Sequence, residues 1–557
     1  MDNNPIPAHK KQTDYQAMIE AVSLCTQAQV HCYMPEQAHA FYGANTIAVE
    51  RELAGAFVVK PVLGSEGEQT EVSNIRHIIR LANHYKIPLY TISTGQNWGY
   101  GSSAPAAATL RCFILDLSLL KRIELNVELG IARLQPGVTQ QDLRDYLDST
   151  NVELMVPVTG AGPTCSIVGN ALERGYGITP HADHFGAVTS LTAVLSDGSL
   201  YQSAIASLDT TAQGVVDTTY KWGLGPYLDG LFTQSNLGVV TNLSLKLAHL
   251  PAVVESFYLF CAKETDLELV LPIVRQVLKE FSGIVGSINI MDSRRMLSMM
   301  VPSADELSLC VETTLERLKQ QYRVSQWTCM GSLYGNAKVV KAVKKEIKRQ
   351  LKGKACIERS LFISAKAVLL ASKLFAYLPA NVLTNPRRQL ATLQKSTQIM
   401  RGVPNEVALP LAYWRNRTQP ASEGLNPAKD NCGLLWYAPL VPITQEKVRE
   451  FVSMVRSICL KHNIEPLITM TALQHDCIDS TVPLLFDRSD STAVKAAKAC
   501  LDELFTTGCQ LGFVPYRLNI EQQNTRLDPQ SPHWSLVSKI KHVMDPHNIL
   551  APGRYNP

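Results

Sequence analysis

The feature that most restricts the fold of this chain is a glycine-rich run at residues 94–105, which holds Gly95, Gly99 and Gly101. Glycine adopts backbone conformations that a side chain would block, and it lets backbone N–H groups come close to a phosphate. The run departs from the dinucleotide-binding pattern, because no Gly-x-Gly-x-x-Gly opens a helix with an acidic residue about 20 positions later. A phosphate-binding loop and a tight structural turn are both consistent with it.

Two more loops of this kind follow at residues 156–176 and 223–241. The first loop is rich in small residues, so it could pack closely against a flat ligand. The second combines glycines with polar side chains. Ordinary connections between elements are short, about 4–6 residues. Three such loops exceed what turns require, and they predict a ligand-binding region in this half of the chain.

Periodicity places these loops in an α+β unit. Apolar residues at helical spacing predict a helix that ends near Lys86, and residues 87–92 and 113–117 are short apolar strands. Thr139 is a suitable N-cap for a helix that follows it. A hairpin turn is predicted at Asp197 and Gly198.

Residues 240–247 alternate as a strand, and Pro251 marks a boundary. A strand followed by a helix then recurs three times, which predicts a second α+β domain. These pairs lie at residues 255–262 with 266–281, 433–439 with 445–462, and 480–486 with 492–507. The first forty residues are mixed and predict no particular element.

Composition is that of an enzyme-sized globular protein. The 557 residues are 46% hydrophobic and 18% charged, and the net charge of +4 gives no reason to expect a nucleic-acid partner. No secretory signal opens the chain, and Lys366 and Lys373 interrupt the most apolar stretch, residues 363–383. We therefore expect a cytoplasmic protein without a membrane span, in which residues 363–383 form a buried amphipathic helix.

Cysteine and histidine spacing predicts no metal site. The 13 cysteines form no Cys-x-x-Cys pair, which favours reduced thiols. His181 and His184 make a His-x-x-His, but no cysteine or acidic cluster completes a zinc pattern.

Five motifs, in order along the chain, resemble those of the vanillyl-alcohol oxidase/p-cresol methylhydroxylase flavoproteins. They lie at residues 97–101, 169–175, 179–184, 225–238 and 545–554. The resemblance covers roughly residues 53 to 557. It implies an α+β fold with a PCMH-type FAD-binding domain of two α+β subdomains and an α+β cap domain that binds the substrate. The implied division is an N-terminal segment at 1–52, the FAD-binding domain at 53–251, the cap at 252–510, and a segment at 511–557 that returns to the FAD domain.

The resemblance also implies a reaction, the oxidation of para-substituted phenols. A phenolate gives up a benzylic hydride to flavin N5 and becomes a quinone methide. Holding a phenol of pKa near 10 as its anion at pH 7 requires about 4 kcal/mol of selective stabilisation. In the family two tyrosines and one arginine supply it, and Tyr100, Tyr516 and Arg517 match them. An arginine with two hydroxyls is suited to bind an oxyanion.

The cofactor implied is FAD. The residues that the resemblance assigns to it come from the three loops and from the C-terminal motif. They are Thr94, Gly95, Gln96, Asn97, Trp98, Gly99, Gly101, Ser102, Pro157, Thr159, Gly160, Ser166, Gly169, Asn170, Glu173, Arg174, Gly175, Tyr176, Gly238, Val239, Val240 and Arg554.

The chain departs from the family pattern in several places. Some relatives have an aspartate near flavin N5, but residues 158–161 hold no carboxylate, so no residue is assigned to activate water. His181 stands where relatives often have tyrosine, as an addition to the site or an ordinary loop histidine. For a covalent flavin link Tyr437 is the candidate, but in a strand it points away from the face of Leu434. We therefore favour non-covalent FAD.

Other properties stay open. The electron acceptor is O2 or a redox protein, and the resemblance allows a homodimer. A non-phenolic alcohol or a natural-product intermediate is an alternative substrate, and a non-catalytic flavin-binding protein is a second alternative. The basic helix predicted at residues 338–354 has an apolar stripe, so we interpret its lysines as a solvated face; a docking patch for an acidic partner is the alternative.

Overall fold

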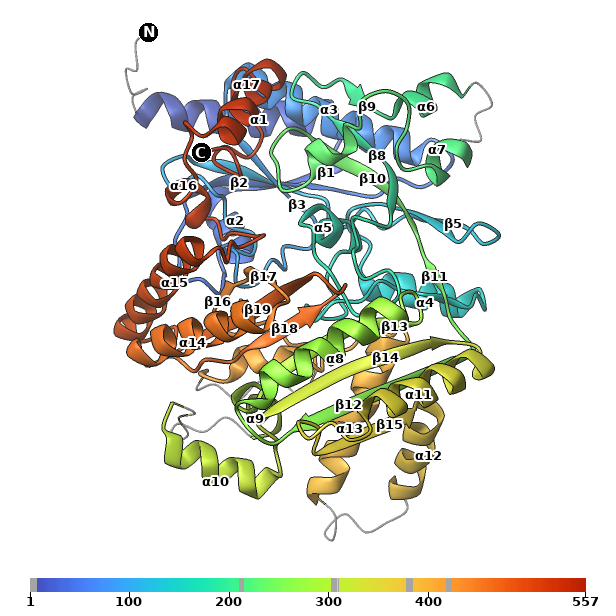
Figure 1. The fold of residues 1–557 in the computed structure, drawn as a ribbon. Coiled ribbons are helices and arrows are strands. Elements are labelled where there is room, and N and C mark those ends of the chain that lie inside the picture. The colour runs from blue at the N-terminus through green and yellow to red at the C-terminus, as the bar shows by residue number, and fades with distance from the viewer. Residues whose placement is uncertain (1–7, 210–214, 302–307, 309, 377–383, 417–422) are drawn as a thin grey trace.

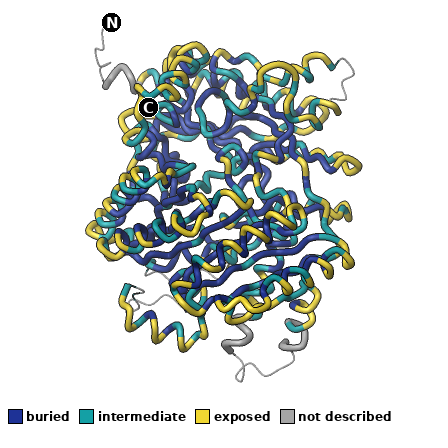
Figure 2. Tube along the Cα trace, viewed as in Figure 1, coloured by how far each residue is buried: buried dark blue, intermediate teal, exposed yellow. Residues whose placement is uncertain are grey.

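A computed structural model of the chain describes all residues except 1–7, 210–214, 302–307, 309, 377–383 and 417–422. The described residues form two lobes (Figure 1). The first lobe contains two sheets and both ends of the described chain. The cap lobe is built on one large sheet. Buried residues follow the strands of both lobes (Figure 2).

The first sheet of the first lobe is mixed. Its order is β1(Val30–Tyr33), β2(Leu53–Val59), β4(Cys112–Asp116), β3(Leu89–Ile92). Strands β2, β4 and β3 are parallel, and β1 pairs antiparallel to β2. Parallel strands are commonly buried on both faces and read as continuous apolar runs, and every residue of β2 and β4 is buried.

The second sheet is antiparallel. Its order is β5(Ile123–Asn126), β6(Ile131–Leu134), β10(Val239–Lys246), β8(Val188–Val194), β9(Leu200–Tyr201). A two-stranded ladder of β7(Leu154–Met155) and β11(Ala248–His249) leads toward the cap lobe.

Helices cover these sheets. In the first lobe they are α1(Ala8–Cys25), α2(Pro35–Tyr42), α3(Gly67–Tyr85), α4(Gln140–Ser149), α5(Ile167–Leu172), α6(Ala204–Leu208), α7(Val215–Thr219), η1(Asp229–Phe232), α16(Gln522–Thr525) and α17(Pro532–Met544). Helix α3 buries Ile75, Ile78, Ile79 and Ala82 against the mixed sheet. Its i, i+3, i+4, i+7 spacing is that of an amphipathic helix.

The cap lobe has one antiparallel sheet. Its order is β15(Arg359–Ser364), β12(Val253–Cys261), β14(Trp327–Gly335), β13(Val285–Asp292), β18(Thr469–Ala472), β19(Cys477–Phe486), β16(Gly433–Tyr437), and β17(Leu440–Pro442) also pairs with β19. One face is covered by the four helices α8(Asp266–Glu280), α11(Ala337–Leu351), α14(Gln445–Lys461) and α15(Ser491–Leu511). The cap lobe also holds α9(Ser293–Met300), α10(Glu312–Tyr322), α12(Ala365–Ala376), α13(Thr384–Met400) and η2(Leu409–Tyr413).

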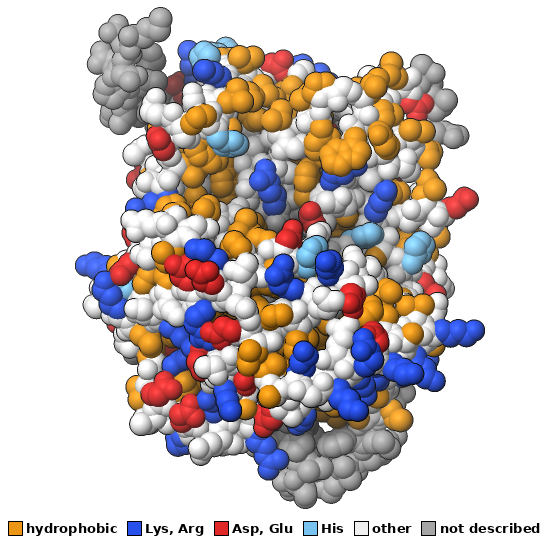
Figure 3. Space-filling view, in the orientation of Figure 1, with side chains coloured by type: hydrophobic (Ala, Val, Ile, Leu, Met, Phe, Trp, Pro, Cys, Tyr) orange, Lys and Arg blue, Asp and Glu red, His pale blue; other side chains and the backbone are white. Residues whose placement is uncertain are grey.

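The α+β class is confirmed, and so are most of the predicted elements. Thr139 caps α4, and its hydroxyl accepts a hydrogen bond from the backbone N–H of Asp142 while the Asp142 carboxylate binds the Thr139 backbone N–H. Strands β8 and β9 flank Asp197 and Gly198 as the turn predicts. The basic helix is α11, with Val340, Val343, Ile347 and Leu351 buried. Basic side chains gather on the surface over this part of the cap lobe (Figure 3).

Residues 8–25, for which the sequence predicted no particular element, form α1, and Tyr15, Met18 and Val22 pack on the mixed sheet. One predicted element differs from the structure. The buried helix expected at 363–383 starts instead at Ala365, and it exposes Leu369 and Leu370. Residues 377–383 lie outside the described part. No helix in the part of the chain that the structure describes is long and apolar enough to cross a membrane.

A buried ion pair fastens residues 541–550 to the first lobe. Lys541 is 3% exposed, and its Nζ donates to Asp545 Oδ2 at 2.6 Å, to the Asn236 carbonyl at 2.7 Å and to the Leu550 carbonyl at 2.8 Å. Asp545 in turn accepts from the backbone N–H groups of Ile549 and Leu550. Leu550 then lies beside β3, where it forms a bridge with Leu89.

We expect Lys541→Met to destabilise the protein. Removing one partner of a buried pair costs about 3–5 kcal/mol, because the other charge stays buried without compensation. The melting temperature should therefore fall by several degrees. Lys539→Met, an exposed lysine on the same helix α17, is the matched control. Equal melting temperatures for the two variants would contradict the role given to Lys541.

Candidate active site

A cavity of about 950 Å³ lies between the two lobes. Its first wall is made of the three glycine-rich loops. Its second wall is the face of the cap sheet opposite the helices, where Thr328, Met330, Thr469, Thr471 and Thr481 contribute side chains. A volume of this size is at the upper end of the range for ligand sites, about 300–1,000 Å³.

Most residues predicted to contact the cofactor line this cavity. They are Thr94, Gly95, Gln96, Asn97, Trp98, Ser102, Thr159, Gly160, Ser166, Gly169, Asn170, Glu173, Gly175, Tyr176, Gly238, Val239, Val240 and Arg554. Gly99, Gly101, Pro157 and Arg174 are not among the lining residues. The Arg174 guanidinium instead donates to the Thr233 hydroxyl.

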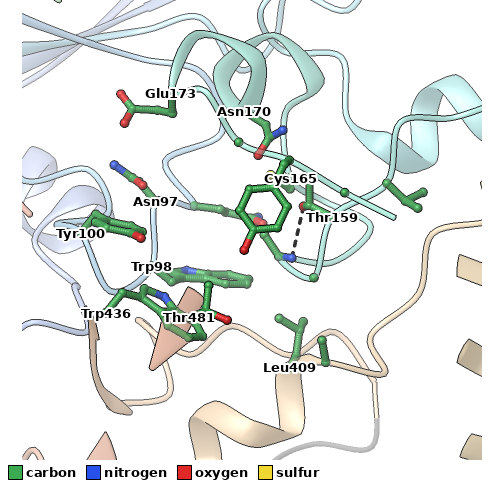
Figure 4. Close-up of a pocket in the computed structure, with 18 of the residues that line it drawn as sticks. Asn97, Trp98, Tyr100, Thr159, Cys165, Asn170, Glu173, Leu409, Trp436 and Thr481 are labelled. Carbon is green, nitrogen blue, oxygen red and sulfur yellow. Dashed lines mark hydrogen bonds between the residues drawn. The ribbon is translucent and has the colours of Figure 1, made fainter. Parts of the chain in front are cut away.

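Gly99 and Gly101 are required by packing. Both have positive φ, +77° and +139°. A Cβ on Gly99 would lie 2.1 Å from Trp436 Cδ1, and one on Gly101 would lie 2.9 Å from Ile520 Cγ2. Gly99 thus lets the loop touch strand β16 of the cap, where Figure 4 shows Trp98 and Trp436 side by side, and Gly101 lets it touch the segment after α15. The loop is both a lobe contact and a cavity wall.

An ion cluster centred on Glu173 closes one side of the cavity. Arg517 Nε donates to Glu173 Oε2 at 3.1 Å, and Arg554 pairs with Glu173 Oε1. Arg517 Nη2 also donates to Asn97 Oδ1 at 2.5 Å. Two guanidinium groups against one carboxylate leave one net positive charge. The cluster therefore favours an anion nearby.

The structure brings Tyr100, Tyr516 and Arg517 together. The Arg517 guanidinium carbon lies 4.2 Å from the centroid of the Tyr100 ring. Burial raises the pKa of Tyr100 and of Tyr516 well above the usual range, and the charge of Arg517 only partly offsets this. Both hydroxyls therefore stay protonated at neutral pH and can donate hydrogen bonds.

Two further residues extend this group. The ring of Tyr176, which the sequence assigned to the cofactor, lies 6.0 Å from that of Tyr516, and its hydroxyl donates to the Asp479 carbonyl at 3.3 Å. Burial raises the pKa of the Asp479 carboxyl to about 6, and the like charge of Asp183 adds to the effect. Sequence reasoning missed Asp479, because a single aspartate in a strand carries no local signal.

Neither His181 nor His184 lines the cavity. Burial lowers the pKa of His184 to about 4, so its ring is neutral, and Asn170 Nδ2 donates to His184 Nδ1 at 2.6 Å. Among the described residues no group of three or more His, Cys, Asp or Glu could hold a metal ion.

The cavity fits an extended polar cofactor. Ser102 Oγ and Asn236 Oδ1 are buried, line the cavity and have no partner among the described residues, so they are available to a ligand. Burying such atoms without a hydrogen bond is costly. Ser102 follows the glycine run, and Asn236 lies in the loop at 223–241.

The structure does not bring Tyr437 to the cavity. Its side chain lies in the cap core, and its hydroxyl donates to the Phe513 carbonyl at 3.2 Å. The alternate residues Leu434 and Trp436 line the cavity instead. Strand alternation places Tyr437 on the opposite face, as expected.

Comparisons with known proteins agree with this arrangement. Residues 68–203 match the family described as an FAD binding domain. The chain is 31% identical over 505 residues to 1'-carboxy-chondrochloren decarboxylase of Chondromyces crocatus, covering 89% of this chain and 90% of that one. It is 26% identical over 494 residues to the 4-cresol dehydrogenase flavoprotein subunit of Pseudomonas putida, covering 87% and 86%. A crystal structure of p-cresol methylhydroxylase with substrate bound has the same fold, with a TM-score of 0.82 and 23% identity over 98% of this chain and 97% of that one.

The chain therefore belongs to the vanillyl-alcohol oxidase/p-cresol methylhydroxylase family of flavoproteins, as its motifs predict. It is an FAD-dependent oxidoreductase of that family, with FAD as its cofactor.

We expect FAD to be bound without a covalent bond, because the Tyr437 hydroxyl is engaged in the cap core. Acid precipitation of the holoprotein should leave the yellow cofactor in the supernatant, and Tyr437→Phe should behave in the same way. A yellow pellet from the wild type that becomes colourless in Tyr437→Phe would contradict this expectation.

The raised pKa of Asp479 implies that the stability of the protein depends on pH. An aspartate whose folded pKa exceeds its unfolded value of 3.8 favours folding less as the pH rises from about 4 to about 6. Above pH 6 its charge costs about 3 kcal/mol. Asp479→Asn should therefore raise the melting temperature at pH 8 and leave it unchanged at pH 4.

Asp476→Asn is the matched control, because Asp476 is exposed in the turn before the same strand. We expect it to give no gain that depends on pH in this way. An equal gain for Asp479→Asn at pH 4 and pH 8 would contradict the pKa assigned to the carboxyl.

Proposed function

We propose that the protein oxidises a para-substituted phenol, held as its phenolate by Tyr100, Tyr516 and Arg517. One observation carries the proposal: the protonated hydroxyls of a buried and a half-buried tyrosine stand beside a guanidinium whose cluster has a net positive charge. Hydrogen bonds that join charged groups are about twice as strong as neutral ones. This arrangement suits an oxyanion.

The phenolate form matters for the chemistry. Only the anion pushes enough electron density through the ring to release a hydride from the benzylic carbon and form a quinone methide. FAD, when bound, supplies the two-electron acceptor. The residues of the chain bind the oxygen, stabilise its charge and orient the ring.

Tyr100, Tyr516 and Arg517 together form the phenolate clamp. Contacts from both lobes hold these residues in place. The backbone N–H of Tyr516 donates to the Ala438 carbonyl at 3.2 Å, and Gln234 Nε2 donates to the Tyr516 carbonyl at 3.1 Å. Asn97 and Glu173 fix the Arg517 guanidinium. Donors fixed before the substrate arrives need no reorganisation when charge develops, which is what makes such sites effective.

A second candidate substrate is a larger natural-product intermediate. The relative from Chondromyces crocatus is named as the decarboxylase of a carboxyl-bearing compound. The cap side of the cavity extends past the clamp to a group of flexible, apolar side chains. They are Met291, Met296, Met299, Met300 and Met330. Methionine adapts to irregular apolar groups, so this space suits a substrate larger than a cresol.

We expect Tyr516→Phe to lower kcat for 4-alkylphenols by about 100-fold to 1,000-fold, the usual effect of removing one oxyanion donor. Arg517→Lys should also lower kcat, because lysine keeps the charge but loses the fork that binds Asn97 and Glu173. Turnover would be measured with 4-propylphenol in holoprotein of equal FAD content.

Tyr85→Phe, on helix α3 away from the cavity, is the control for loss of a tyrosine hydroxyl. Undiminished turnover in both Tyr516→Phe and Arg517→Lys would rule out the phenolate clamp. If the wild type and all the variants oxidised a non-phenolic alcohol at the same rate, that result would instead support the alternative substrate class.

A further inference from the structure

A third arginine lines the cavity in addition to Arg517 and Arg554. Arg295 belongs to the first turn of α9, in the cap lobe. Its Nε donates to the Thr469 hydroxyl at 3.2 Å, and its Nη1 donates to the Ser298 hydroxyl at 3.3 Å. Both partners are neutral. Within the described residues, no carboxylate lies within ion-pair distance of Arg295.

The nearest acidic group is already engaged. Asp292 Oδ1 accepts from the backbone N–H of Arg295 at 2.9 Å, as the N-cap of α9, and from that of Ile468 at 3.3 Å. Asp292 Oδ2 faces Arg456 at 3.6 Å. Burial lowers the pKa of Arg295 to about 10, and Asp292 offsets only part of this. The guanidinium is still charged at neutral pH.

Arg295 therefore differs from the other two arginines of the cavity. Arg517 and Arg554 share Glu173, whereas Arg295 lines the cavity without an ion-pair partner among the described residues. Burying an unpaired charge is unfavourable. An anionic group on a ligand in the cavity would remove this cost.

Strand pairing relates Arg295 to the phenolate clamp. Its partner Thr469 lies opposite Thr481, and Thr471 is two residues further along the same face of β18. The Tyr176 hydroxyl lies near Thr471 and Thr481. Interactions with these two threonines lower its pKa, although burial raises the pKa by more. Residues two apart in a strand are separated by about 7 Å. Arg295 thus lies within about one such step of Tyr176, whose ring is 6.0 Å from that of Tyr516, so a chain attached to a phenol ring could reach it.

We propose that Arg295 binds a carboxylate that the substrate carries on the chain para to its phenol oxygen. This inference rests on the proposed function, because the phenol defines where the chain points. A guanidinium fork matches the two oxygens of a carboxylate. One cation with two neutral hydroxyls suits a single negative charge better than a phosphate dianion.

The surroundings assign this subsite to the substrate. Arg295 lines the cavity from the cap lobe, together with the methionines named above and the unpartnered Asn289 Oδ1, whereas Ser102 Oγ and Asn236 Oδ1 belong to the first lobe. A wall of methionines and neutral polar side chains with one cation favours a ligand that carries a single acid group. The substrate class is therefore a phenol with an acid-bearing alkyl substituent.

The test compares two ligands that differ in one group. The holoprotein is titrated by calorimetry with 3-(4-hydroxyphenyl)propanoate and with 4-propylphenol, and the ratio of the two Kd values is measured. We expect the wild type to prefer the carboxylate. Arg295→Met should shift the ratio against the carboxylate by about 10-fold to 100-fold, the usual size of a hydrogen bond to a charged group. Arg295→Lys should fall between them.

Arg317→Met removes an exposed arginine from α10 in the same lobe, and it should keep the wild-type ratio. An unchanged ratio in Arg295→Met, or a wild type without preference, would overturn the proposal. Should Arg295→Met fail to fold, as judged from its FAD content, Arg295→Lys and Arg295→Gln decide the question. Anaerobic bleaching of FAD by 4-propylphenol is recorded separately. Its absence in the wild type would count against phenol oxidation, while the ratio of Kd values would still decide the role of Arg295.

Discussion

The Glu173 carboxylate is the interaction on which the rest of the site depends. It joins three parts of the chain, the end of α5, the segment after α15 and the C-terminal motif, through Arg517 and Arg554. Without it the two guanidinium groups would repel each other beside Tyr100. With it, their geometry is fixed and one positive charge remains. The position of the clamp and its preference for an anion thus have the same origin.

The cavity has two differently built electrostatic regions. Around Glu173, charges are paired within the protein, so this region is rigid and its net charge is small. Around Arg295, the counter-charge would come from a ligand, and the neighbouring methionine side chains can adapt to the shape of that ligand. The first arrangement suits a group common to all substrates of a reaction class. The second suits a group that distinguishes one substrate from another.

Most of the fold could be predicted from the sequence, because its signals are local. The capping residues at Thr139 and the helical spacing of Ile75, Ile78 and Ile79 depend only on nearby positions. The residues of the clamp were found through motifs, and the structure brings them together. Gly99 and Gly101 were assigned to the cofactor, because glycine content does not tell a ligand contact from a packing contact with Trp436.

Other parts of the site could not be predicted. Arg295 and Asp479 are single charged residues in ordinary elements, and what sets them apart is the lack of a nearby counter-charge. That property depends on residues distant in sequence, so no spacing rule records it. Helix α1 is a different case. Tyr15, Met18 and Val22 do have helical spacing, but most other residues of the segment are polar or small, so its amphipathic pattern is weak.

The closing of the first lobe by residues 541–554 has a consequence for biosynthesis. Arg554 lines the cavity and lies against Tyr90, 464 positions earlier in the chain. The cap is translated between these two positions. In a nascent chain Arg554 therefore cannot take its place at the cavity until the whole cap has been synthesised.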